Sequence, residues 1–361
     1  MVILGAGASY DSAQAYRPVL PRGGGYANFG VSAPPPVDEG GPWRPPLAKD
    51  LFLDRHHVLG DIVGKYPKLT HILPYLREPS NGRSVEQMLE SLQEEGKGNP
   101  ESLREFASVR FYLCELLHKV TEEWSSRTNG VTNYPPLVKD ILRFTNPGEQ
   151  VCLVTFNYDL LLEHALYTFD FKRRNPEEHL DSHPILKLFK LHGSVHWARL
   201  VDNVPPLPPG IRLIPQQLIE RADTIRLSDK FVLANATNQH EMFNFEKPIF
   251  PAIAIPVQTK TEQYFECPRT HLACLSEMLP RIRKILIIGW QAREAHFSQM
   301  LQLRLPMLRH VMVVGRDSLD AGEILKYFQQ EIRYEVPSLY VGQGGFTQFI
   351  VNQEGHSFLK A

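Results

Sequence analysis

Cysteine and long apolar runs are both scarce in this sequence, and each scarcity excludes a class of protein. Four cysteines in 361 residues are too few and too scattered for a disulfide framework, which favours a reducing, intracellular setting. No run approaches the roughly 20 apolar residues needed to cross a bilayer, and the first residues lack the basic segment of a signal peptide. We therefore expect a cytoplasmic protein without a membrane segment.

An excess of charge is also missing. The 39 Lys and Arg residues balance 40 Asp and Glu residues, so no overall field draws the protein onto anionic lipid or nucleic acid. We expect no direct sequence-specific binding of nucleic acid. The composition, 43% hydrophobic and 22% charged, is typical of soluble globular proteins. The length favours two domains, or one large domain that carries an insertion.

Proline and glycine, by contrast, are concentrated in one stretch, residues 17–47, where they exclude helix and central strand. A loop this long is usually functional or disordered, and we consider it a candidate gate for a nearby site. It follows a short apolar run, residues 2–4, which ends in Gly5-Ala6-Gly7-Ala8-Ser9. That run predicts a strand entering a tight turn.

Helical spacing of apolar residues fills the next segment, residues 48–146. Ser84 and Gln87 make a capping-box pattern ahead of one helix, and a second, long helix follows Pro100. We interpret 48–146 as an all-helical insertion. The core domain is then formed by the flanking parts of the chain, residues 1–47 and 147–361.

Further short apolar runs, rich in branched residues, predict strands that alternate with amphipathic helices. The predicted strands span 150–156, 185–191, 284–289 and 310–315, and the helices span 294–305 and 318–329. This alternation is typical of a parallel sheet with crossover helices. The predicted fold class is therefore α/β, a Rossmann-like doubly wound parallel sheet with a helical insertion after the first strand and turn. Residues 201–262 show no regular pattern, so we expect an irregular subdomain there.

The turn after the first strand is a candidate phosphate-binding turn. Gly5 and Gly7, with Ala6 and Ser9 beside them, would let the backbone approach a pyrophosphate. The dehydrogenase fingerprint needs a third small residue where this sequence has Tyr10, and an acidic residue about 20 positions later. Neither is present, which disfavours a dehydrogenase. The glycine pair alone fits a structural tight turn equally well.

Polar residues follow two of the predicted strands, at the edge where open α/β sheets bind ligands. Asn157 could hydrogen-bond ribose hydroxyls in both directions, and His192 could accept a proton near neutral pH. Gly193 and Ser194 behind the imidazole would leave room for a ligand. Each residue also has a plainer interpretation: Asn157 as a turn or cap, Asp159 as a helix N-cap and His192 as a buried core residue.

The spacing of histidines and cysteines gives little evidence for a metal site. His192 and His196 are four residues apart, which would suit a metal on a helix, but the Gly-Ser pair between them argues against a helix. Cys267 and Cys274 are separated by six residues, and no second cysteine pair matches the spacing of a zinc knuckle. We expect no metal site.

Taken in order along the chain, four motifs resemble the signature of the sirtuin superfamily. They are Gly5-Ala6-Gly7-Ala8-Ser9, Thr155-Phe156-Asn157-Tyr158-Asp159, Leu191-His192-Gly193-Ser194 and Ile287-Ile288-Gly289-Trp290. The resemblance implies that Asn157 and Asp159 serve the nicotinamide ribose of NAD and that His192 is the base. Protein-deacetylating sirtuins also carry a four-cysteine zinc module and a Gly-Ile-Pro-Asp-Phe-Arg segment, and this sequence has neither. It is therefore more similar to the sirtuin-like NAD hydrolases of prokaryotic anti-phage defence.

Residues that follow two further predicted strands are weaker candidates for NAD binding. Gly289 and Trp290 would let the backbone pass beside a ribose or phosphate, although a buried aromatic residue after a strand is common. Arg316 or Asp317 could meet the adenosine half of NAD. A capped helix start explains Asp317 equally well.

Three functions are compatible with these residues. The first is an NAD glycohydrolase that releases nicotinamide and ADP-ribose, in which the 5–9 turn holds the pyrophosphate, Asn157 the ribose and His192 a proton. The second is an NAD-dependent protein deacylase or ADP-ribosyl transferase. The third is a non-enzymatic subunit that senses NAD or ADP-ribose.

The resemblance also implies partners and a role. A hydrolase of this kind would deplete NAD during infection, causing abortive infection, and would need to be held inactive until a trigger arrives. No sensor domain is recognisable in this sequence. We therefore expect a homo-oligomer that responds to a separate protein, such as a translocase-type ATPase or an Argonaute-like protein.

Overall fold

The computed structural model describes residues 1–13, 43–53, 58–79, 82–204, 215–234, 247–257, 265–306, 308–332, 338–342 and 344–360. Of the Pro- and Gly-rich loop predicted over 17–47, only 43–47 falls within these ranges. The predicted gate therefore lies almost wholly outside the described residues. The proline-rich run 205–209 also lies outside them.

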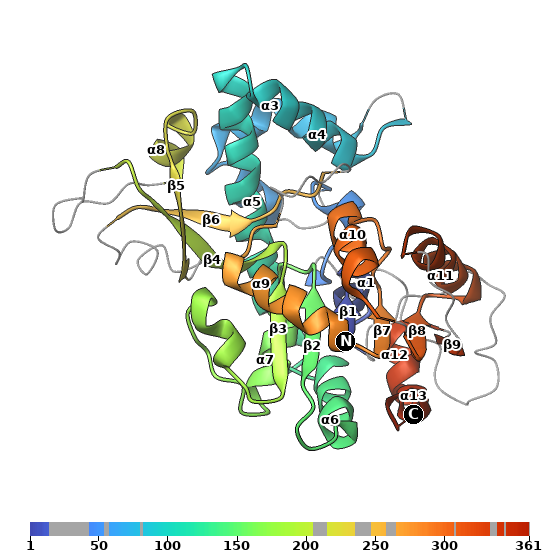
Figure 1. Cartoon of the computed structure of the whole chain (residues 1–361). Coiled ribbons are helices and arrows are strands. Elements are labelled where there is room, and N and C mark those ends of the chain that lie inside the picture. The colour runs from blue at the N-terminus through green and yellow to red at the C-terminus, as the bar shows by residue number, and fades with distance from the viewer. Residues whose placement is uncertain are drawn as a thin grey trace.

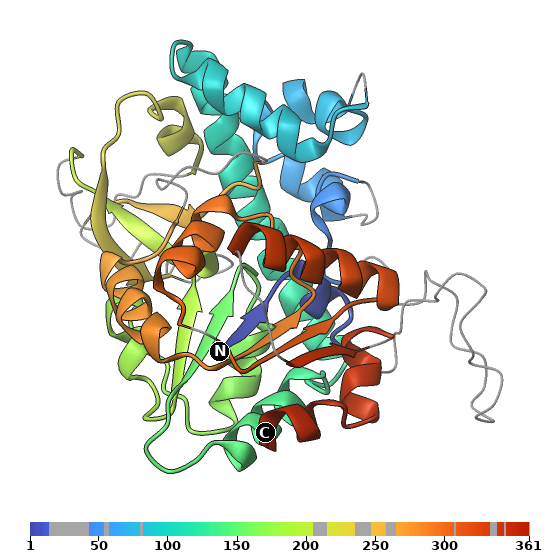
Figure 2. The ribbon, with the colours of Figure 1, turned by 45° about the vertical axis from the view of Figure 1, so that its right-hand side comes forward.

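The centre of the molecule is a six-stranded parallel sheet (Figures 1 and 2). Its strands are β1 (Val2–Leu4), β2 (Val151–Thr155), β3 (Leu186–Lys190), β7 (Lys284–Ile288), β8 (His310–Val314) and β9 (Ser338–Gly342). Their spatial order is β3-β2-β1-β7-β8-β9, and every neighbouring pair is parallel. The chain thus winds outward from β1 in one direction, returns to β7 and winds outward in the other. This arrangement confirms the predicted Rossmann-like doubly wound α/β fold.

The strands are largely apolar because the sheet is covered on both faces. On β1, Ile3 packs into the cluster on one face, whereas Val2 and Leu4 pack into the cluster on the other. The first face is covered by α9 (Arg269–Met278), α10 (Ala295–Arg304) and α11 (Ser318–Ile332). The second is covered by α6 (Tyr134–Phe144), α7 (Leu161–Tyr167), α12 (Gly345–Val351) and α13 (Gly355–Lys360).

The segment predicted to be helical is helical where it is described. It contains α2 (Val58–Val63), α3 (Pro67–Arg77), α4 (Val85–Gly96) and α5 (Pro100–Arg127), and α6 follows. The predicted capping box is present, since Ser84 Oγ accepts from Gln87 N and the Gln87 side chain accepts from Ser84 N. The end of α5 and all of α6 pack on the main sheet, through Trp124 and Tyr134 among others. The boundary of the insertion at residue 146 stays a prediction.

A second, antiparallel sheet lies beside α5 (Figure 1). Two of its three strands fall within residues 201–262, for which the sequence predicts irregular structure. It consists of β4 (Gly193–Val201), β5 (Leu227–Leu233) and β6 (Ile249–Ile253) in the order β5-β4-β6, with α8 (Pro215–Glu220) nearby. The prediction of an irregular 201–262 segment is therefore wrong for its described part. Both outer strands are edges, which allows Pro251 within β6 and exposed charges on β5.

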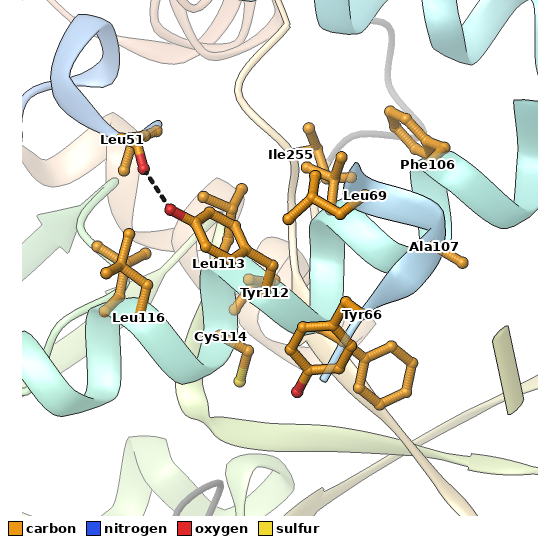
Figure 3. Packing of buried hydrophobic residues seen from close by; sticks show 14 of the residues in the cluster. Leu51, Tyr66, Leu69, Phe106, Ala107, Tyr112, Leu113, Cys114, Leu116 and Ile255 are labelled. Carbon is orange, nitrogen blue, oxygen red and sulfur yellow. Dashed lines mark hydrogen bonds between the residues drawn. The ribbon is translucent and has the colours of Figure 1, made fainter. Parts of the chain in front are cut away.

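The helical segment and the second sheet share one hydrophobic cluster. Phe111 of α5 meets Phe250 of β6 edge-on at 4.9 Å between ring centroids. Figure 3 shows the part of this cluster around Tyr112, whose hydroxyl donates to the carbonyl of Leu51 at 2.9 Å. Within the described part of the chain, no helix has the length and apolar composition that crossing a membrane requires.

Candidate functional site

The parallel sheet brings nearly all of the predicted site residues to one edge, because each follows the carboxyl end of a strand. They are residues 5–9 after β1, Asn157 and Asp159 after β2, His192 after β3, Gly289 and Trp290 after β7, and Asp317 after β8. The chain reverses its direction of winding between β1 and β7, and ligands of doubly wound folds bind at this switch point.

The glycines at the switch point are required by close packing of two turns. A Cβ added to Gly5 would lie 2.5 Å from the carbonyl oxygen of Gly289, and one added to Gly289, at φ +62°, would lie 2.2 Å from Ala8 N. Gly7 N donates to the carbonyl of Gly289 at 3.1 Å. The short helix α1 (Ala6–Tyr10) follows, with Ala6 exposed. These glycines thus serve as a structural tight turn, and contact with a phosphate stays a prediction.

Asn157 is held in one orientation beside that turn. Its Nδ2 donates to the carbonyl of Gly5 at 3.0 Å and to Ser9 Oγ at 2.9 Å, and its backbone N–H donates to Thr155 Oγ1. A carbonyl oxygen is only an acceptor, so the amide nitrogen must face Gly5. Both N–H groups are therefore committed, and the Asn157 side chain can offer a ligand only its acceptor, Oδ1. The expectation that Asn157 bonds in both directions is corrected accordingly.

Tyr134 belongs to the same network, although no sequence motif points to it. Its hydroxyl lies 2.8 Å from Ser9 Oγ, and its side chain is 1% exposed. Tyr134 begins α6, so a helix of the predicted insertion reaches the turn after β1. The hydrogen bond joins residues 125 positions apart, and no local pattern reports such a contact.

His192 is buried among aromatic rings. Its ring meets Phe156 edge-on at 4.9 Å and lies nearly parallel to Tyr158 at 6.1 Å. Trp290 stacks on Phe156 at 5.6 Å, and its Nε1 donates to Glu294. The structure thus brings His192, Trp290 and the loop that carries Asn157 together.

Gly193 and Ser194 are the first two residues of β4. Gly193 has φ +80°, and a Cβ there would lie 1.9 Å from the carbonyl oxygen of Ala252 in β6. Ser194 is completely buried, and its Oγ accepts from His196 N at 3.5 Å. The lack of a side chain at Gly193 therefore lets β4 approach β6. The expectation that Gly193 and Ser194 leave room for a ligand stays a prediction.

Both predicted aspartates accept a backbone hydrogen bond near a helix start. Asp159 Oδ1 accepts from Leu161 N at 3.1 Å, at the start of α7. Asp317 is exposed, and its Oδ1 accepts from Asp320 N at 2.8 Å, at the start of α11. The plainer interpretation thus holds for Asp317, whereas Asp159 precedes Leu160, the N-cap of α7, so its interpretation as an N-cap is wrong. No hydrogen bond among the described residues joins Asp317 to the other predicted site residues.

A buried ion pair connects α7 to the end of β3, and its lysine also bonds the loop after β2; the sequence did not point to it. Lys190 Nζ donates to Glu163 Oε1 at 2.6 Å and to the carbonyl of Asp159 at 2.5 Å. Burial raises the pKa of Glu163, and the Lys190 charge offsets only part of that effect. This pair fixes the spacing between the loop that carries Asn157 and the strand that precedes His192.

Arg44, which the sequence also did not single out, lies beside the last residue of α1. Its guanidinium carbon is 4.9 Å from the ring centroid of Tyr10 and 5.9 Å from that of Trp124, and Arg44 is 7% exposed. Neither Nε nor Nη1 has a hydrogen-bond partner among the described residues. Buried cations are normally paired with an anion, so this guanidinium is suited to a negatively charged ligand.

Tyr158 marks the side of the site that faces the helical segment. Burial raises its pKa, the charge of Glu294 adds to this effect, and Arg110 of α5 opposes it. Arg110 Nη1 lies 3.8 Å from Glu266 Oε2, and Glu266 N donates to the carbonyl of Leu191, next to His192. The wall beyond Tyr158 is therefore charged.

Histidine and cysteine do not assemble a metal centre in the described ranges, where no group of three or more His, Cys, Asp or Glu could hold an ion. His196 lies on β4 and packs against His118 at 5.1 Å between ring centroids. Comparison of the chain with protein-family models and with curated proteins gave no match in either case.

Proposed function

We propose that this protein is an NAD glycohydrolase, which cleaves NAD to nicotinamide and ADP-ribose at the carboxyl edge of its main sheet. One observation carries the proposal. Asn157 is fixed at the switch point with both N–H groups engaged, and its Oδ1 is left as an acceptor two residues from the sheet. A fixed acceptor at this place suits a ribose hydroxyl or an attacking water.

The surroundings fit an anionic dinucleotide. Arg44 is a buried cation without a hydrogen-bond partner at Nε or Nη1 among the described residues, and it lies beside the turn after β1. The diphosphate of NAD would supply the missing negative charge. The aromatic rings of Phe156, Trp290 and Tyr158 would accept the flat nicotinamide and keep bulk water from the reacting carbon.

The chemistry then needs few groups. The bond between the nicotinamide nitrogen and the ribose carbon breaks, its electron pair leaves with neutral nicotinamide, and the ribose becomes oxocarbenium-like. Water attacks that carbon while Asn157 Oδ1 accepts a hydrogen bond from the water or from a ribose hydroxyl. His192 accepts the proton that the water loses, and the products are nicotinamide and ADP-ribose.

The proposal extends to regulation and role. An unregulated enzyme of this kind would deplete the NAD of its own cell, so activity would depend on a homo-oligomer or on a separate sensor or ATPase protein. Depletion of NAD on such a signal is an effective response to phage infection. We propose this role in the cytoplasm, together with the hydrolase activity.

The test is to incubate the purified protein with NAD, alone and with the product of its neighbouring gene, and to follow nicotinamide and ADP-ribose by chromatography. We expect His192→Ala and Asn157→Ala each to lower kcat by about 100-fold or more. His71→Ala is the control, because His71 is exposed on α3. Wild-type turnover in both site variants would refute the assignment.

Two outcomes would point to the other candidate functions. Intact NAD under both conditions, with binding still measurable by calorimetry, would indicate a sensor subunit. Release of nicotinamide only when an acylated peptide is added would indicate a deacylase.

A further inference from the structure

Tyr134 lies outside every motif of the sheet edge, yet it contacts the residue that bonds Asn157. Its ring packs edge-on against Phe346 at 5.4 Å, and its hydroxyl reaches Ser9 Oγ at 2.8 Å. Ser9 Oγ in turn accepts from Asn157 Nδ2 at 2.9 Å. A chain of hydrogen bonds therefore runs from the first residue of α6 to the site.

Both side-chain hydroxyls in this chain of hydrogen bonds are buried, with Tyr134 1% and Ser9 2% exposed. Ser9 Oγ accepts from Asn157 Nδ2, and the Tyr134 hydroxyl hydrogen-bonds both Ser9 and the Asn157 side chain. The three side chains therefore form one buried network in which Tyr134 holds Ser9 and Asn157 in place.

The backbone around Tyr134 is tied to the same turn. Asn133 Nδ2 donates to the carbonyl of Asp11 at 2.8 Å, and Trp124 Nε1 donates to Ser12 Oγ at 2.8 Å. The junction between α5 and α6 is thus bonded to the residues that directly follow Ser9. These bonds hold the Tyr134 hydroxyl in place independently of the packing of its ring.

We propose that Tyr134 is a positioning residue for the NAD site, which holds Ser9 as the acceptor that fixes the Asn157 amide. This inference rests on the proposed function and adds to it a residue from the helical segment. Movement of α6 would change the site through this hydroxyl.

Electrostatics keep Tyr134 in the form that this role requires. Burial raises the pKa of Tyr134 well above its ordinary value, and the charge of Asp159 adds to the effect. Hydrogen bonding to Ser9 and Asn157 opposes it more weakly. The hydroxyl therefore stays protonated at neutral pH.

The experiment compares two matched tyrosine variants. Tyr134→Phe removes only the hydroxyl that reaches Ser9, and Tyr112→Phe removes an equally buried hydroxyl that donates to Leu51 (Figure 3). We expect Tyr134→Phe to lower kcat/KM for NAD about tenfold, through the loss of one oriented hydrogen bond. Tyr112→Phe should keep the wild-type value, and thermal unfolding of both variants controls for folding.

A double-mutant cycle with Ser9→Ala tests the route of the effect. If Tyr134 acts through Ser9, Tyr134→Phe causes no further loss of kcat/KM in the Ser9→Ala background. Wild-type kinetics in Tyr134→Phe, or two losses that multiply, would overturn the inference and leave the hydrolase intact. Wild-type protein that neither binds nor cleaves NAD would overturn the proposed function, and this inference with it.

Discussion

The ammonium group of Lys190 lies 2.6 Å from the carboxylate of Glu163, and the two side chains are 1% and 4% exposed. Lys190 ends β3 two residues before His192, and it also donates to the carbonyl of Asp159, two residues after Asn157. A single buried cation thus connects the two loops that carry the proposed catalytic residues. The other carboxylate oxygen of Glu163 is buried without a partner among the described residues, so the pair is sensitive to loss of Lys190.

Replacing Lys190 by Met should lower the free energy of unfolding by about 3–5 kcal/mol, because it leaves the Glu163 charge buried and unpaired. Urea unfolding at neutral pH measures the loss. Lys97→Met is the control, since Lys97 and Glu94 form an exposed pair and such pairs contribute about 0.5 kcal/mol or less. A double variant, Lys190→Met with Glu163→Leu, should recover most of the stability. Equal urea midpoints for wild type and Lys190→Met would contradict the prediction.

The packing of the two turns at the switch point makes a second prediction. Gly289→Ala should destabilise the fold by about 2–5 kcal/mol, because it combines a left-handed φ with a Cβ 2.2 Å from Ala8 N. Gly322→Ala, within α11, meets no atom within 4 Å and should stabilise by about 0.5–1 kcal/mol. Thermal and urea unfolding distinguish the two signs. A tolerated Gly289→Ala would mean that the turns can separate.

Five of the six strands of the main sheet, all but β9, could be predicted from the sequence because their signal is local. Each is a short run of apolar, mostly branched residues that alternate between two buried faces, as Val2, Ile3 and Leu4 do. The capping box of Ser84 and Gln87 is equally local. Alternation of these strands with amphipathic helices then fixes a parallel sheet, and a parallel sheet brings its strand ends to one edge.

The rest could not be predicted because it depends on contacts between distant residues. Tyr134 meets Ser9 across 125 positions, and neither residue type nor spacing marks the pair. The second sheet was missed for a related reason. Asp229 and Lys230 are exposed and Pro251 lies within a strand, so β5 and β6 resemble loops until β4 supplies their hydrogen-bond partners.

Arg44 yields a prediction in which stability and affinity move in opposite directions. Arg44→Met should weaken NAD binding about 10- to 100-fold, because a charge-assisted hydrogen bond is lost. Without NAD, the same change should leave the free energy of unfolding equal or about 1 kcal/mol higher, since it removes a buried guanidinium whose Nε and Nη1 have no hydrogen-bond partner among the described residues. Calorimetry and urea unfolding measure the two quantities. Arg127→Met, at a half-exposed arginine over Trp43, should change neither; unchanged affinity in Arg44→Met would refute a role in binding the diphosphate.

Two buried histidines make stability depend on pH. The rings of His179 and His271 stack at 6.3 Å between centroids, and both Nδ1 atoms lack a partner among the described residues. Burial lowers the pKa of His179 to about 3, with a smaller contribution from His271, and burial lowers the pKa of His271 to about 4. Their charged forms are therefore excluded from the folded state at neutral pH.

In the unfolded chain, both histidines have pKa values of about 6.5 and bind protons that they do not bind in the folded chain. Their contribution to the free energy of unfolding is therefore fully present above pH 6.5 and is lost as the pH falls toward 4. His271→Gln keeps a donor for the carbonyl of Pro176, which His271 Nε2 now bonds at 2.7 Å. This variant should reduce the slope of unfolding free energy against pH by up to about 1.4 kcal/mol per pH unit. Ile324→Val, in the hydrophobic cluster that contains Phe189 and Trp197 beside His271, should instead lower stability by about 1 kcal/mol at every pH. Urea unfolding between pH 4 and 8 measures both effects; an unchanged slope in His271→Gln would show that this histidine does not control the acid sensitivity of the fold.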